Sequence, residues 1–165
     1  MTPLDITVHN TPQGLATAAQ TLLQHAGQEK VWALIGDLGA GKTTLVRALC
    51  AQLGVQDNVS SPTFALIHEY ATATDVPVYH FDFYRLHHAD EALELDCTAY
   101  FDSGHYCFVE WPHTVVHWLP TPYYQVHLTP ISQTSRRVEA SMYYPPLATT
   151  PLPYPSGAAS DTADG

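Results

Sequence analysis

The chain has 165 residues and a mass of 18.2 kDa, the size of one domain. Its 16 acidic and 6 basic residues give a net charge of −10, which disfavours autonomous binding to nucleic acid. No apolar run approaches the length of a membrane span, and the first residues show no secretory signal, so we expect a cytoplasmic protein without membrane contact. The cysteines lack CxxC spacing and are expected to be reduced, mostly buried thiols: Cys50, Cys97 and Cys107.

The first third of the chain alternates helical and strand patterns. Apolar residues recur every three or four positions over 12–26, with Thr11 suited to cap this helix and Gly27 to end it. The apolar run 31–35 is typical of a short strand buried on both faces. Helical spacing returns over 43–53. The order therefore predicts helix, buried strand, helix.

The rest of the chain is dominated by strand patterns, with a short acidic helix predicted over 90–95. The predicted strands cover 64–70, 78–84, 106–109, 124–129 and 136–142. Prolines then become frequent, and a disordered tail is predicted over 144–165, so the domain itself spans 1–143. A proline-rich ligand for another protein is the alternative for the tail.

One motif carries a specific chemistry. Residues 36–43, GDLGAGKT, match the phosphate-binding loop GxxxxGK[ST] between a predicted strand and a predicted helix. Glycines let backbone N–H groups converge on a phosphate, and the helix start adds a favourable dipole. We therefore predict that a nucleotide binds to Gly36, Asp37, Leu38, Gly39, Ala40, Gly41, Lys42, Thr43 and Thr44. The alternative is a glycine turn beside a surface lysine.

A P-loop enzyme also needs acidic groups for the metal and for water. Glu110 ends the apolar run 106–109, the position of a Walker-B-type acid. Asp82 lies within the aromatic run 80–85, where an acid is costly unless it is paired or linked to a metal. The alternatives are a solvated strand end for Glu110 and a structural salt bridge with Arg85 for Asp82.

Four motifs in this order resemble the TsaE (YjeE) family, bacterial P-loop ATPases needed to make threonylcarbamoyladenosine in tRNA. They are GDLGAGKTT from residue 36, SPTF at 61–64, HFDFYR at 80–85 and VEWP at 109–112. The resemblance covers about residues 5 to 140. It implies a three-layer α/β, P-loop NTPase-like fold, whose central sheet is mostly parallel with added antiparallel strands and has helices on both faces.

The resemblance also implies a function. Family members bind ATP with Mg²⁺, hydrolyse it slowly and act with the TsaD–TsaB complex, which modifies adenosine 37 of ANN-decoding tRNAs. Contact with tRNA would then be indirect, through these partners. The implied roles are phosphate and magnesium binding by Lys42 and Thr43, γ-phosphate sensing by Thr63, catalysis by Asp82, magnesium binding and catalysis by Glu110, and packing beside the nucleotide by Trp111.

The sequence departs from the family pattern at two acidic positions. His113 stands where the family has the second acid of EWPE, and residues 96–99 (DCTA) replace an acidic segment before Tyr100. These departures bear on hydrolysis rate and partner contacts more than on nucleotide binding. Two other functions stay open: a small-molecule kinase, disfavoured because the arginines do not cluster as in a lid, and a non-catalytic nucleotide-binding scaffold.

Overall fold

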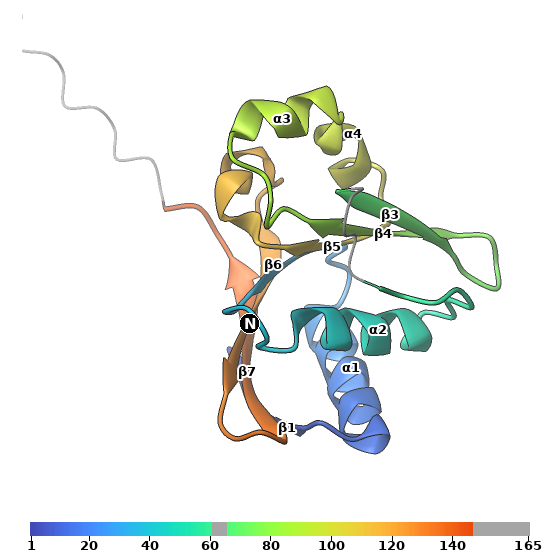
Figure 1. Cartoon of the computed structure of the whole chain (residues 1–165), viewed down its shortest axis with the longest axis vertical. Coiled ribbons are helices and arrows are strands. Elements are labelled where there is room, and N and C mark those ends of the chain that lie inside the picture. The colour runs from blue at the N-terminus through green and yellow to red at the C-terminus, as the bar shows by residue number, and fades with distance from the viewer. Residues whose placement is uncertain (61–65, 147–165) are drawn as a thin grey trace, which may run out of the picture.

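The computed structural model describes residues 1–60 and 66–146, and strands and helices alternate in it from β1 to α2 (Figure 1). The strands are β1 (Leu4–His9), β2 (Val31–Ile35), β3 (Ile67–Ala71), β4 (Pro77–Asp82), β5 (Tyr106–Glu110), β6 (Tyr123–Pro130) and β7 (Ser135–Tyr143). The helices are α1 (Pro12–Ala26), α2 (Lys42–Gln52), α3 (Ala89–Glu94) and α4 (Cys97–Phe101), with 3₁₀ turns η1 (Pro112–Thr114) and η2 (Val116–Trp118).

The described strands form one sheet in the order β1-β7-β6-β2-β5-β4-β3. Its centre is parallel, because β2 pairs in parallel with β5 and β6, and β5 pairs in parallel with β4. Antiparallel pairs extend it on both sides, β3 on β4 and β7 between β6 and β1. The carboxyl ends of the four parallel strands therefore meet at one edge of the sheet.

Helices cover both faces of the sheet (Figure 1). Buried residues of α1 and α2 pack with Trp32 on one face, and buried residues of α3 and α4 pack with Ala33 on the other. Residues 31–34 are all buried, which confirms the prediction of a strand enclosed on both faces. The three-layer α/β, P-loop NTPase-like class is likewise confirmed.

Most predicted elements are present within one or two residues. Helix α1 has the predicted bounds, and Thr11 Oγ1 accepts a hydrogen bond from the Gly14 N–H at 3.0 Å. Helix α2 and helix α3 each begin and end one residue earlier than predicted. The last two strands pair antiparallel as β6 and β7. The three cysteines are buried free thiols, as predicted.

Other expectations need correction. Strand β1 and helix α4 were not predicted, and β3 begins at Ile67 rather than at 64. Strand β4 ends at Asp82 rather than at 84, because the Asp82 carboxylate accepts a hydrogen bond from the Tyr84 N–H at 3.0 Å and turns the chain.

Two predicted segments lie outside the described residues. Thr63 and the rest of 61–64 fall in the gap at 61–65, and most of the predicted tail falls in 147–165. Residues 144–146 are described without helix or strand. Within 1–60 and 66–146, no helix combines the length and apolar character needed to cross a membrane.

Candidate nucleotide-binding site

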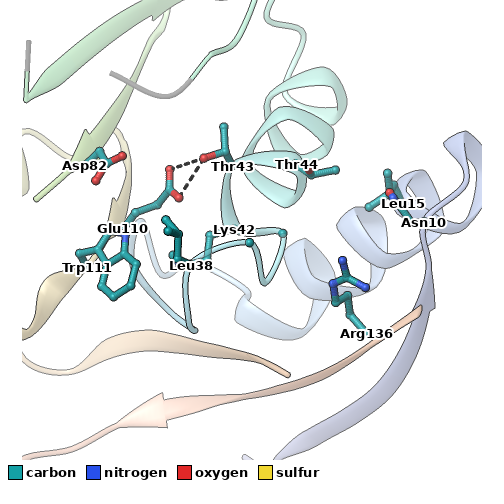
Figure 2. A pocket seen from close by; sticks show the side chains of 12 residues that line it. Asn10, Leu15, Leu38, Lys42, Thr43, Thr44, Asp82, Glu110, Trp111 and Arg136 are labelled. Carbon is teal, nitrogen blue, oxygen red and sulfur yellow. Dashed lines mark hydrogen bonds between the residues drawn. The ribbon is translucent and has the colours of Figure 1, made fainter. Parts of the chain in front are cut away.

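The predicted phosphate-binding loop joins the carboxyl end of β2 to the start of α2 (Figure 2). Gly39 and Gly41 have φ angles of 79° and 100°, which side chains rarely tolerate. Gly36 is needed for space, because a Cβ there would lie 2.9 Å from the Leu128 carbonyl oxygen. The first N–H groups of α2 have no partner within the helix and carry its positive dipole end. Such a turn is suited to bind an anion.

Lys42 is enclosed by its own loop. Only 5% of the residue is exposed. Its ammonium donates hydrogen bonds to the carbonyl oxygens of Gly36 and Asp37 at 2.6 and 2.9 Å. It also lies 4.1 Å from the centre of the Trp111 ring. The alternative of a glycine turn beside a surface lysine is therefore wrong.

The Lys42 ammonium also lies among carboxylates. Burial lowers the pKa of Lys42, and the nearby charges of Glu110, Asp82 and Asp37 act in the opposite direction. These acids favour the charged form of the lysine, which a phosphate ligand requires.

Glu110 is the buried acid of the site. It ends β5, is 2% exposed, and accepts hydrogen bonds from the Thr43 hydroxyl at 3.0 Å through both carboxylate oxygens (Figure 2). Its Oε2 also lies 2.5 Å from Nε2 of His80. The alternative of a solvated strand end is excluded by this burial. Thr43 and Glu110 together offer oxygen ligands of the kind that Mg²⁺ prefers.

Asp82 lies beside Glu110 because the two residues are register partners across the parallel pair β4 and β5. Both line one pocket, and Asp82 is less buried than Glu110. Two carboxylates at neighbouring strand ends give this part of the pocket a negative charge. The salt bridge with Arg85 stays the alternative explanation for Asp82.

The backbone turns sharply directly after Glu110. Trp111 has a φ of 55°, in the left-handed region that non-glycine residues seldom adopt. This turn brings its ring over Lys42 and to 4.9 Å from the ring of Tyr84. The Trp111 ring therefore lies against the lysine of the phosphate-binding loop, and its packing beside a nucleotide stays a prediction.

The pocket unites most of the predicted residues. Its walls are Asn10, Leu15, Leu38, Gly39, Gly41, Lys42, Thr43, Thr44, Asp82, Glu110, Trp111 and Arg136. Gly36, Asp37 and Ala40 belong to the loop but are not part of this wall; Ala40 is buried beneath it. Thr63 lies outside the described residues.

Four functional candidates were missed by sequence reasoning. Asn10, Leu15 and Arg136 line the pocket across Lys42 from Asp82 (Figure 2). Arg136 also donates to the Ala40 carbonyl at 2.9 Å and so supports the loop from β7. The fourth candidate, His80, holds Glu110 from the interior.

The comparisons with known proteins identify the family. A model described as "Threonylcarbamoyl adenosine biosynthesis protein TsaE" matches residues 9–138. The chain belongs to the TsaE family. The TsaE protein of Bacillus subtilis is 35% identical over 127 residues, which cover 77% of this chain and 78% of that protein. The TsaE protein of Nostoc is 39% identical over 114 residues, 67% of this chain and 68% of that one.

A solved structure agrees with this TsaE assignment. The crystal structure of YdiB from Bacillus subtilis superposes with a TM-score of 0.66 at 28% identity, covering 86% of each chain.

The two departures from the TsaE pattern differ in their exposure to solvent. His113 is exposed in η1 with its ring 6.3 Å from that of Trp111, whereas Cys97 is buried at the start of α4.

Proposed function

We propose that this chain binds ATP with Mg²⁺ and hydrolyses it slowly in the cytoplasm, in support of threonylcarbamoylation of adenosine 37 in ANN-decoding tRNAs. The TsaD–TsaB complex is its proposed partner. The observation that carries this proposal is that Lys42, Thr43 and Glu110 meet in one pocket at a helix start.

Each residue has a distinct proposed role. Lys42 exchanges its loop carbonyls for β- and γ-phosphate oxygens, and the loop N–H groups bind the phosphate chain. Thr43 and Glu110 would hold magnesium, which when bound neutralises charge on the phosphates. Asp82, the register partner of Glu110, would accept a hydrogen bond from the attacking water.

The net charge of −10 supports a division of labour with partners. A surface of this sign repels tRNA, so the partners bind the tRNA and this chain contributes nucleotide-dependent association. We expect no specific tRNA complex in a gel shift with this chain alone at physiological salt. Titration against the TsaD–TsaB pair should show tighter binding with ATP than with ADP.

The test of the activity is phosphate release with and without the TsaD–TsaB pair. Glu110→Ala should retain much of the ATP affinity, lose hydrolysis and make ATP binding less dependent on magnesium, because Glu110 supplies a metal ligand and no positive charge. ATP binding without phosphate release, in either condition, would instead favour a nucleotide-binding scaffold. Transfer of phosphate to a small acceptor would favour a kinase.

A further inference from the structure

His80 is a buried polar residue in the middle of β4. None of it is exposed, and its register partners are Phe108 on β5 and His68 on β3. Alternation along β4 puts His80 on the same face as Asp82, two residues later. The residue thus lies directly behind the acidic part of the pocket and does not line it.

The two ring nitrogens of His80 have different surroundings. Nε2 lies 2.5 Å from Glu110 Oε2, whereas Nδ1 is buried without a hydrogen-bond partner among the described residues. An ionised Glu110 carboxylate can only accept, so Nε2 must carry the proton in this contact. Nδ1 has no partner among the described residues, so the contact with Glu110 is the one hydrogen bond that the ring makes there. A buried unpaired nitrogen is destabilising, and an apolar side chain at this position would avoid that penalty.

We propose that His80 is a positioning residue for Glu110. The carboxylate is held from two sides, by the Thr43 hydroxyl toward the pocket and by the His80 N–H toward the interior. A ligand that takes the Thr43 oxygen leaves His80 as the contact that still orients Glu110. His80 therefore fixes the direction in which Glu110 presents Oε1, the carboxylate oxygen that His80 does not contact, to the pocket.

This inference rests on the proposed function, since it assigns His80 to the acid proposed to hold magnesium. Removing the N–H while keeping an aromatic ring at this position should allow Glu110 to rotate, with little effect on the phosphate contacts proposed for Lys42. Loss of such an outer-shell partner costs about 10- to 100-fold in metal affinity or activity. The effect should appear in kcat and in the magnesium requirement, and much less in KM for ATP.

A matched set of variants tests this. His80→Phe keeps the ring without the donor, and His80→Gln restores an N–H near the position of Nε2. We expect kcat of His80→Phe to fall about tenfold or more, with KM for ATP within about threefold, and substantial rescue by His80→Gln. The control is His68→Phe, because His68 bonds to the Tyr70 hydroxyl at 3.1 Å, does not line the pocket, and should hydrolyse ATP like the wild type.

A second readout does not depend on hydrolysis. Binding of a non-hydrolysable ATP analogue is titrated at increasing magnesium, and His80→Phe should need about tenfold more magnesium for half-saturation than wild type or His80→Gln. If the wild type releases no phosphate, the proposed hydrolysis is wrong and this titration alone decides the role of His80. Equal behaviour of the Phe and Gln variants, in kcat and in magnesium requirement, would overturn the inference.

The wild-type protein offers a third measurement that no folding defect can obscure. The ¹⁵N shifts of the His80 ring report which nitrogen carries the proton. A proton on Nε2 is expected from the contact with Glu110. A bare Nε2 would mean that His80 accepts from a protonated Glu110, and the positioning role would be rejected.

Discussion

The Lys42 ammonium donates to two loop carbonyls. In the proposed complex with ATP, phosphate oxygens would take the place of these acceptors. A charge-assisted hydrogen bond contributes about 1.5–3 kcal/mol, which is roughly tenfold or more in affinity. Lys42→Ala should therefore weaken ATP binding at least tenfold by calorimetry. Lys30→Ala is the control, because Lys30 lies over Tyr106 and outside the pocket; equal ATP affinity in both variants would contradict the phosphate-binding loop.

Asp82 is expected to contribute to ATP hydrolysis much more than to ATP binding. Its carboxylate lines the pocket and supplies no positive charge, so Asp82→Ala should keep most of the ATP affinity. Hydrolysis should fall by about 10²-fold or more, the usual contribution of a positioned acid or base. Single-turnover phosphate release measures it. A wild-type rate in Asp82→Ala would favour the structural salt bridge with Arg85.

Among the elements, the start of α1 depends on one small residue. A Cβ at Gly14 would lie 2.3 Å from the His9 carbonyl oxygen, where β1 ends, so no side-chain movement can relieve the clash. Gly14→Ala should lower the free energy of unfolding by about 1–3 kcal/mol, since the helix start must shift. Thermal or urea unfolding checks this against Gln13→Ala, an exposed neighbour on the same turn. Equal stability of the two variants would show that the helix start adjusts freely.

The elements that could be predicted are those whose pattern is contained within them. The apolar period of α1 and the apolar run of β2 are local signals, and so is the phosphate-binding loop, which occupies consecutive residues. Strand β1 was missed because it is a short edge strand, half exposed, held by pairing with β7 far along the chain. Arg136 was missed for the same reason: it lies on β7, far along the chain from the Ala40 carbonyl that it contacts, and no local motif marks it.

His80 is a different kind of omission. Its position two residues before Asp82, in a predicted strand, already put both side chains on one face. The contact of His80 with Glu110 depends on the parallel pairing of β4 with β5, and neither segment alone predicts that pairing. Thr63 stays a prediction, because it lies outside the described residues.

At the scale of the whole molecule, the buried thiols make the free energy of unfolding depend on pH above about 9. Burial raises the pKa of Cys50 and Cys107 to about 12 and that of Cys97 to about 11, from an ordinary value of 9.0. The unfolded chain therefore loses these protons first, and the free energy of unfolding should fall as pH rises from about 9 toward 12. Burial also raises the pKa of Tyr124, which acts in the same direction.

Urea unfolding at pH 8 and pH 10.5 measures this change, with a lower midpoint expected at the higher pH. The same burial should make thiol alkylation at pH 8 slow in the native protein and fast in denaturant. Thiols that react equally fast in both states would contradict the buried, protonated form.

Trp111 gives the molecule a built-in optical signal. Of the three tryptophans, Trp32 is enclosed in the core and Trp118 lies in η2, whereas Trp111 lines the pocket with an ammonium over its ring. The emission of an indole shifts with the electric field across it, and phosphate that draws Lys42 away from the ring changes that field. Intrinsic fluorescence should therefore report occupancy of the pocket without any label, and Trp111→Phe should remove the signal while the emission of the other two indoles persists.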